Sequence, residues 1–148
     1  MIRRAEPGDE APIRDCARQA YARYVPRIGR EPAPMVADFT AQIAAGSVFV
    51  ATDARGAVEG FIVFHAEGRH VLLENVAVFP HAAGRGVGKA LIAFCEGTAR
   101  DGGFEAVRLY TNAAMTENLA LYPSLGYVEV DRRTEDGFNR VYFEKPLA

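Results

Sequence analysis

The sequence contains only two cysteines, Cys16 and Cys95, too few for a disulfide framework. Neither belongs to a CxxC pair or a Cys/His cluster, and His65, His70 and His81 are scattered, so no metal site is predicted. Both cysteines fall on apolar positions of predicted helices. We therefore expect two small buried thiols in a reducing compartment.

Long apolar runs and blocks of basic residues are also missing. No apolar run approaches the length of a membrane span, so no membrane segment is predicted. Charged residues occur within residues 1–6, so no signal peptide is predicted. The formal net charge is −2, and the Lys and Arg residues form no cluster that would neutralise phosphates. We expect a cytoplasmic protein without a membrane or nucleic-acid partner.

The 148 residues, 49% of them hydrophobic, suit one domain with its own core over residues 1–148. Apolar periodicity predicts four helices, at 9–24, 35–45, 87–101 and 115–125. It predicts strands at 2–6, 47–52, 58–66, 71–79, 106–111, 127–134 and 138–144. The stretch 25–34 holds three prolines and a glycine, so we expect it to be irregular.

The connections between these elements predict the topology. The strands between 47 and 79 follow one another too closely for helical crossovers, so they form an antiparallel meander. The helix at 87–101 then links the strand at 71–79 to a parallel neighbour at 106–111 by a right-handed crossover. Residues 135–137 make a hairpin turn. The expected fold is α/β (α+β): one mixed, mostly antiparallel sheet of about seven strands with four helices.

Three glycines at alternate positions, Gly84, Gly86 and Gly88, follow a strand and open a helix. Helix N-termini present unpaired N–H groups, and glycine lets an anion approach them closely. Three features disfavour a dinucleotide site. The loop lacks the full GxGxxG motif, and the strand before it belongs to the antiparallel meander. The next strand ends in Thr111-Asn112, where a dinucleotide site would have an acidic residue that binds the ribose. A phosphate site and a merely flexible turn both remain open at this point.

Two motifs resemble those of the GCN5-related N-acetyltransferases. Val76-Ala77-Val78-Phe79-Pro80, followed by Arg85-Gly86-Val87-Gly88-Lys89-Ala90-Leu91, is similar to that family's acetyl-CoA-binding motif. Leu121-Tyr122-Pro123-Ser124-Leu125-Gly126-Tyr127 resembles its second motif. The expected element order matches the family's order over essentially the whole chain. Ala83 replaces the usual Gln or Arg, and Met115 replaces the usual Asn, for which Asn118 or Asn112 could substitute.

The resemblance implies acetyl-CoA as the acyl donor and no metal. Backbone amides of the glycine loop would hold the pyrophosphate, and the strand at 71–79 would pair with the pantetheine arm and offer a main-chain N–H near Ala77 to the thioester carbonyl. The residues implied in donor binding are Val76, Ala77, Val78, Ala83, Gly84, Arg85, Gly86, Val87, Gly88, Lys89, Asn112, Asn118 and Tyr122.

Direct transfer of the acetyl group to a primary amine needs a base and an acid. Glu74, on one face of its strand with Leu72, Val76 and Val78 by alternation, is the candidate base, because a carboxylate within an apolar run suits acceptance of an ammonium proton. The alternative is a structural ion pair with an arginine such as Arg108. Tyr122 is the candidate acid for the departing thiolate, and a core tyrosine is the alternative.

The acceptor side is less defined by the sequence. The resemblance places it near the first two helices and the last hairpin, with Tyr21, Tyr24, Arg27 and Met35 as candidates for a small-molecule or peptide amine. Tyrosines and arginines there suit an acceptor with a carboxylate, although solvated surface explains the arginines equally simply. A non-catalytic acyl-CoA-binding or sensing module is the alternative function, and the exposed last strands could support a homodimer.

Overall fold

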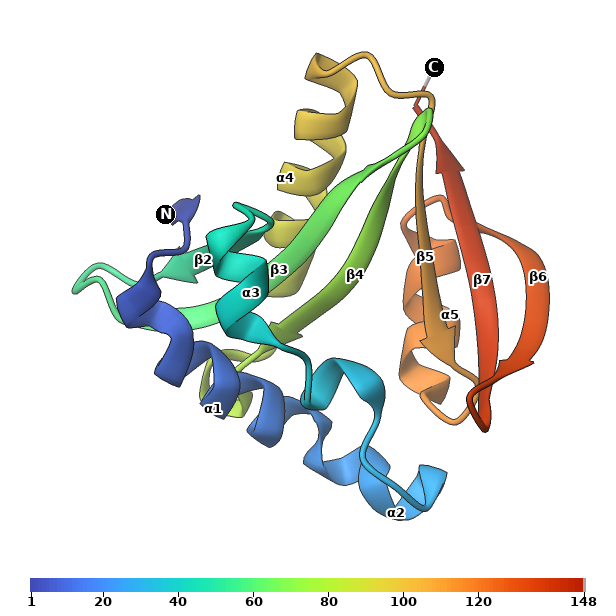
Figure 1. Cartoon of the computed structure of the whole chain (residues 1–148), viewed down its shortest axis with the longest axis horizontal. Helices are drawn as coiled ribbons and strands as arrows, with labels where there is room; N and C mark the ends of the chain where they lie inside the picture. Colours follow the sequence, from blue (N-terminus) through green and yellow to red (C-terminus); the bar gives the residue numbers. More distant parts are fainter. Residues whose placement is uncertain (148) are drawn as a thin grey trace.

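The computed structural model describes residues 1–147 and contains one seven-stranded sheet in the order β1-β2-β3-β4-β5-β7-β6 (Figure 1). The strands are β1 (Ile2–Arg4), β2 (Val48–Thr52), β3 (Val58–Glu67), β4 (His70–Val78), β5 (Ala106–Asn112), β6 (Val128–Glu135) and β7 (Phe138–Pro146). Neighbours are antiparallel except β4 and β5, which are parallel. The predicted fold class, the antiparallel meander and the parallel pairing of β4 with β5 are confirmed.

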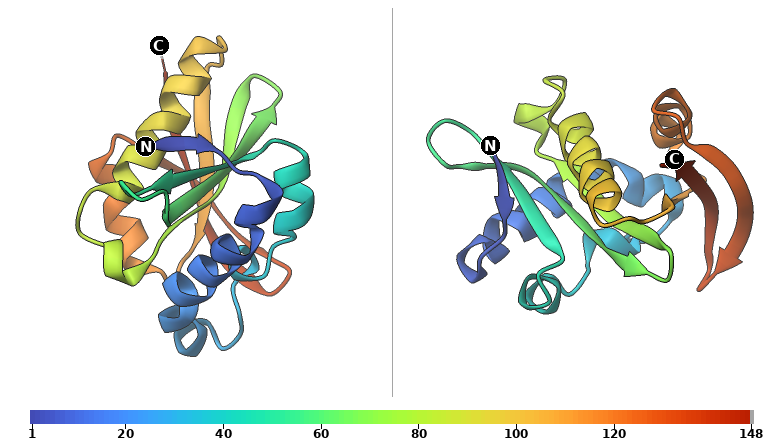
Figure 2. Two further views of the ribbon diagram at one scale, coloured as in Figure 1. Left: turned by 90° about the vertical axis from the view of Figure 1, so that its left-hand side faces the viewer. Right: turned by 90° about the horizontal axis from the view of Figure 1, so that it is seen from above.

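The helices cover both faces of this sheet. Helices α1 (Glu10–Tyr21) and α3 (Phe39–Ala44) pack on one face, and α4 (Val87–Asp101) and α5 (Thr116–Ser124) on the other (Figure 2). These are the four predicted helices. A fifth, α2 (Val25–Ile28), is a single turn. Among the described residues, no helix has both the length and the apolar character that a membrane span requires.

The prediction for residues 9–45 was wrong in detail. The α-helix ends at Tyr21, and a 3-10 turn continues it through Tyr24, close to the predicted end. The stretch expected to be irregular begins with α2, because Pro26 stands in the first turn of α2, where a missing N–H costs nothing. The next helix begins at Phe39, not at residue 35, because Asp38 caps it: the Asp38 carboxylate accepts the Ala41 N–H at 3.0 Å.

The core has two parts, one under each helical layer. On the α1 side, Ile13 and Phe39 pack with Phe61, whose ring meets that of Phe39 edge-on at 5.4 Å. Cys16 lies in this part and Cys95 in the other, both fully buried. Burial raises the pKa of both thiols to about 12, so neither is a thiolate near neutral pH.

The register of β3 and β4 shifts at Glu74. Val63 pairs with Asn75 and Phe64 with Leu73, so Glu74 has no partner on β3. Leu73 and Val76 both pack on the core beneath α4, which strict alternation forbids for residues three apart. The prediction that Leu72, Glu74, Val76 and Val78 share one face of the strand is therefore wrong. The extra residue at the bulge reverses which face the following side chains occupy.

The same point marks the separation of β4 from β5. Their parallel pairing covers only His70–Leu73 of β4, opposite residues 106–109, and beyond Leu73 the two strands diverge (Figure 1). A bulge increases local twist, which turns β4 away from its neighbour. Glu74 therefore lies where the sheet opens.

Candidate functional site

A groove with a volume of about 800 Å³ runs from the opening between β4 and β5 to the start of α4. One wall is the stretch from Gln19 to Tyr24, at the end of α1 and just beyond it, and the other is α5. Eleven of the residues predicted to bind the donor line it: Val76, Ala77, Val78, Ala83, Gly84, Gly86, Val87, Gly88, Lys89, Asn118 and Tyr122. The tertiary structure thus brings residues from 19–24, 76–92 and 118–122 together into one continuous surface.

The glycine loop has the backbone geometry of an anion site. Gly84 and Gly86 have φ of 81° and 80°, in the left-handed region that a side chain disfavours, and a Cβ on either would meet nothing within 4 Å. Gly86 is the N-cap of α4, so the unpaired N–H groups and positive end of this 15-residue helix face the groove. The Arg85 side chain points elsewhere, toward the Glu59 carboxylate (3.4 Å) and the His81 carbonyl (3.3 Å).

The backbone of β4 supplies polar groups along the groove. The Val76 carbonyl accepts the Tyr21 hydroxyl at 3.1 Å, so it points away from β3. The Phe79 N–H donates to Glu59 of β3 at 2.9 Å. Because N–H directions alternate along a strand, the N–H groups of Val76 and Val78 point into the opening, while that of Ala77 points to β3. Of the N–H groups near Ala77, those of Val76 and Val78 are therefore the ones that a molecule in the groove can reach.

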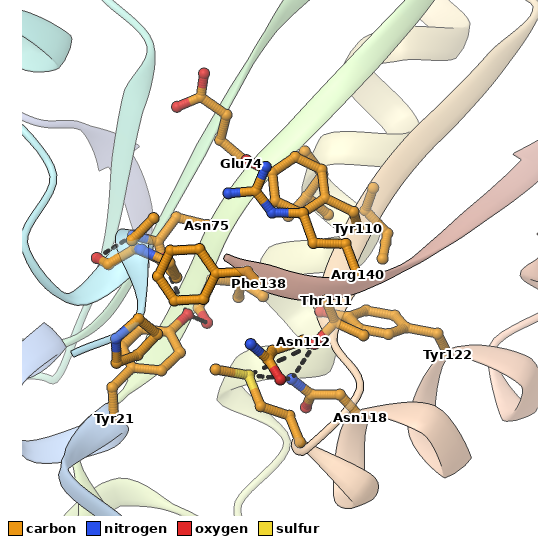
Figure 3. A pocket seen from close by; sticks show the side chains of 17 residues that line it. Tyr21, Glu74, Asn75, Tyr110, Thr111, Asn112, Asn118, Tyr122, Phe138 and Arg140 are labelled. Carbon is orange, nitrogen blue, oxygen red and sulfur yellow. Dashed lines mark hydrogen bonds between the residues drawn. The ribbon is translucent and has the colours of Figure 1, made fainter. Parts of the chain in front are cut away.

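A second, smaller pocket of about 50 Å³, here called the inner pocket, lies between the diverging strands. Residues 32–34 form one side, and Phe138 and Arg140 of β7 form another (Figure 3). It meets the groove at four residues that line both spaces: Tyr21, Val76, Asn118 and Tyr122. A molecule in the groove and a molecule in the inner pocket would therefore meet beside Tyr122.

Tyr122 is both a core residue and a site residue. It is 5% exposed, and its ring packs against Tyr127 and Phe143 at 5.7 and 5.8 Å between centroids. Burial, followed by the nearby Tyr24, raises the pKa of the Tyr122 hydroxyl, so it stays protonated at any ordinary pH. A protonated phenol at the junction of two cavities is able to donate a proton to a group bound there.

Glu74 lines the inner pocket, but its carboxylate extends away from the Tyr122 side (Figure 3). Gln42 of α3 donates to it at 2.9 Å, and His65 Nδ1 lies 3.5 Å from its other oxygen. Arg108, the alternative partner considered from the sequence, instead binds Glu144 at 2.8 Å. The surroundings of the carboxylate are therefore polar, with a histidine beside it and no arginine partner within residues 1–147.

The two asparagines considered for the second motif differ in position. Asn118 lines both spaces, and its amide donates to the Thr111 hydroxyl at 3.1 Å. Asn112 lines only the inner pocket, and its side-chain oxygen accepts the Ala114 N–H at 2.9 Å, which fixes the turn into α5. Of the two, Asn118 is the one in contact with the groove.

The predicted acceptor residues do not form one group. Tyr21 lines both spaces, whereas Tyr24 lines only the groove. Arg27 binds Glu117 of α5 at 2.7 Å, and this contact lowers the pKa of Glu117 to about 2. Met35 packs against the core beneath α1. Arg27 and Met35 line neither space.

Among the residues of the inner pocket that the sequence analysis did not predict are two polar ones, Asn75 and Arg140. Asn75 is 4% exposed; it accepts the Tyr21 hydroxyl at 2.7 Å and donates to the Pro34 carbonyl at 2.9 Å, so it ties β4 to α1 and to the following loop. The sequence does carry a signal for Asn75, because its polar amide stands within an otherwise apolar strand. Arg140 carried no such signal, because alternating polar residues are ordinary in a strand.

No group of three or more His, Cys, Asp or Glu side chains suited to a metal ion occurs within residues 1–147. The site is instead a long groove with a helix N-terminus at one end and a small pocket with Glu74 and Tyr122 at the other.

Comparisons with known proteins agree on one family. A model of the acetyltransferase (GNAT) domain matches residues 44–129, more than half of the chain. A search of the curated proteins found no match to the sequence. Among solved structures, nourseothricin acetyltransferase is 26% identical with a TM-score of 0.63, over 68% of this chain and 65% of that one. This chain thus spans less than two thirds of the length of that enzyme.

Two other solved structures match over almost their whole length. The ribosomal-protein-S18-alanine N-acetyltransferase from Escherichia coli is 21% identical with a TM-score of 0.77, over 100% of this chain and 94% of that one. The PaiA N-acetyltransferase from Thermoplasma acidophilum, solved in complex with coenzyme A, is 16% identical with a TM-score of 0.79, over 99% and 98%. At these identities the likeness concerns the fold.

Proposed function

The chain belongs to the acetyltransferase (GNAT) domain family, and on this premise we propose that it transfers an acetyl group from acetyl-CoA directly to the primary amine of a small molecule or protein. The observation that carries the proposal is the junction of the groove and the inner pocket at Tyr21, Val76, Asn118 and Tyr122. Two reactants held in adjoining cavities react as if at very high local concentration.

The groove suits acetyl-CoA in shape and chemistry. Gly84 and Gly86 leave open space over the N-terminus of α4, where backbone N–H groups can hold the pyrophosphate. They can do so without the polar side chain that Ala83 replaces. The outward N–H groups of Val76 and Val78 can pair with the pantetheine arm. One of them would also polarise the thioester carbonyl.

On the acceptor side, Glu74 would take the proton that an ammonium group must lose before its nitrogen can attack. Because the carboxylate is turned toward Gln42 and His65, a water molecule or a rotation of the side chain would connect it to the amine. His65, 3.5 Å away, can pass the proton on toward solvent. Both thiols of the chain are buried and protonated, which supports direct attack over an acyl-enzyme.

As the C–N bond forms and the C–S bond breaks, Tyr122 would donate its proton to the departing sulfur. We expect Tyr122→Phe to lower kcat about 10-fold, short of the larger effects of general acids, because a thiol of pKa about 8.5 leaves readily. Because the Tyr122 hydroxyl stays protonated throughout, the deficit should be similar from pH 6 to 10. Thiol release measured from pH 6 to 10 checks this, and an unchanged rate over that range removes Tyr122 from the mechanism.

The alternative is a non-catalytic module that binds or senses acyl-CoA. Two measurements separate the functions: thiol release from acetyl-CoA with a panel of amines, and the shift of the melting temperature with CoA alone. We expect both turnover and stabilisation, which amounts to about 2.7 kcal/mol at 100 times the dissociation constant. Stabilisation without turnover on any amine would support the sensing module. Failure to bind any CoA ester would contradict both.

The remaining proposals concern the protein as a whole. Residues 1–148 would act as one domain, in the cytoplasm. The edge strand β6 exposes Val128 (60%) and Val130 (54%), and this apolar strip is compatible with a homodimer. Size determination in solution tests the last point directly.

A further inference from the structure

Arg140 places a guanidinium group in the wall of the inner pocket. It lies on β7, its side chain is only 13% exposed, and it lines the pocket together with Glu74 (Figure 3). The guanidinium carbon stands 4.5 Å from the centre of the Tyr110 ring and 5.5 Å from that of Phe138. Two aromatic faces therefore hold its position.

The hydrogen-bonding capacity of this guanidinium is unused. Within residues 1–147 it makes no hydrogen bond, and its ion pair with Glu135 is long, at 3.7 Å. The same Glu135 oxygen accepts the hydroxyl of Tyr142, so that carboxylate is already engaged. An arginine has five N–H donors in a planar fork that fits a carboxylate. A half-enclosed arginine with free donors suits an anion from outside the chain.

The surroundings hold this arrangement in place. Arg30 crosses from the chain after α2 to the β6–β7 hairpin, where it donates to the Asp136 carbonyl at 3.0 Å and lies 3.8 Å over the Phe138 ring. Opposite, Asn75 fixes the loop at Pro34. The two sides of the inner pocket are thereby tied to β4 and β7, so the guanidinium is positioned before an acceptor binds.

We propose that Arg140 binds a carboxylate of the acceptor, so that the substrates of this enzyme are small primary amines that also carry a carboxylate. The inference rests on the proposed acetyl transfer and names its substrate class. A singly charged carboxylate fits better than a phosphate, because Glu135 partly offsets the positive charge of the guanidinium.

Opposite charges on the pocket wall would also orient the acceptor. The carboxylate would face Arg140, and the ammonium group would lie within reach of Glu74 and of the junction with the groove. An amine without a carboxylate would leave the guanidinium unpaired, and an enclosed unpaired charge disfavours binding.

Matched pairs of acceptors that differ only by the carboxylate test this. They are glycine and methylamine, β-alanine and ethylamine, γ-aminobutyrate and propylamine, leucine and isoamylamine, and phenylalanine and phenethylamine. For each, kcat/KM is measured by thiol release from acetyl-CoA, and binding is measured by calorimetry in the presence of CoA. We expect the carboxylate-bearing member of the best pair to be preferred about 10- to 100-fold.

Variants assign the preference to the residue. Arg140→Gln should abolish the preference by lowering kcat/KM for the amino acid alone, and Arg140→Lys should restore part of it. The matched control is Arg133→Gln, an arginine of the same hairpin that also stacks on a tyrosine, at 4.7 Å from Tyr142, but lines neither cavity. It should leave the preference intact. CoA affinity and melting temperature report whether each variant is folded.

Each outcome has a definite meaning. Equal use of both members of every pair overturns the proposal while the proposed transfer stands, and so does an equal loss for both members in Arg140→Gln. Selective binding of the carboxylate member without turnover supports the subsite and contradicts the transfer. If no member of any pair binds in the presence of CoA, the carboxylate site is wrong.

Discussion

Replacement of Glu74 by glutamine is expected to lower kcat/KM about 100- to 10,000-fold, the range for loss of a positioned general base. Glutamine keeps the size of the side chain and its neighbours Gln42 and His65, but it cannot accept the ammonium proton. The affinity for CoA should not change, because Glu74 lines the inner pocket and not the groove. Thiol release with the fastest acceptor, and calorimetry with CoA, provide the two measurements.

Glu67→Gln is the control for that experiment. Glu67 ends β3, is 55% exposed in its side chain, and lies 3.9 Å from the other nitrogen of His65, yet it lines neither cavity. The two variants remove the same charge on either side of one histidine. A similar rate loss in both would point to the local charge rather than to a base at Glu74. Full activity of Glu74→Gln would exclude Glu74 as the base.

Replacement of Gly86 by valine is expected to weaken CoA binding about 100-fold or more. Valine strongly disfavours the φ of 80° at this N-cap, so the first turn of α4 must move. The N–H groups of that turn would then no longer point toward the pyrophosphate. Hydrogen bonds to a charged group contribute about 1.5 to 3 kcal/mol each, so two lost bonds suffice for an effect of this size. The dissociation constant of CoA is the measured quantity.

A matched glycine separates binding from stability. Gly56 has a φ of 85° in the turn between β2 and β3, with open space around it, and it does not line the groove. Gly56→Val should therefore lower the melting temperature through the same backbone strain and leave CoA affinity unchanged. Comparable affinity loss in both variants would contradict a special role of the loop at Gly86.

The groove that we propose for the donor was largely predictable because its signals are local. Glycines spaced two apart at the end of a strand indicate a helix N-terminus that can approach an anion, and the groove does contain Gly84, Gly86 and Gly88. The motif around Tyr122 likewise placed a tyrosine on the helix beside that groove. Each of these depends on a few adjacent residues whose backbone geometry the residue types themselves favour.

The detail around Glu74 was not predictable in the same way. The register shift that leaves Glu74 unpaired is a property of β3 and β4 together. No residue pattern within β4 alone predicts this shift. The turn α2 was also not predicted, since Pro26 is compatible both with a loop and with the start of a helix. Such choices are decided by packing against distant segments.

By itself, the sequence determined the fold class, the order of the elements and the glycine loop, and it pointed to Glu74 and Tyr122 as a candidate pair. Hydrophobic periodicity and motif spacing are local properties of the sequence, so they could be recognised without the tertiary structure. Only the tertiary structure decided where the sheet opens, which N–H groups of β4 face the groove, and that Arg140 lies in the inner pocket with its donors free. Those features arise where segments far apart in the sequence meet, as when Arg30 reaches residue 136 across the chain. The inner pocket, which we propose for the acceptor, is lined by residues from such distant segments. For this reason the sequence indicated the proposed donor groove more readily than the proposed acceptor site.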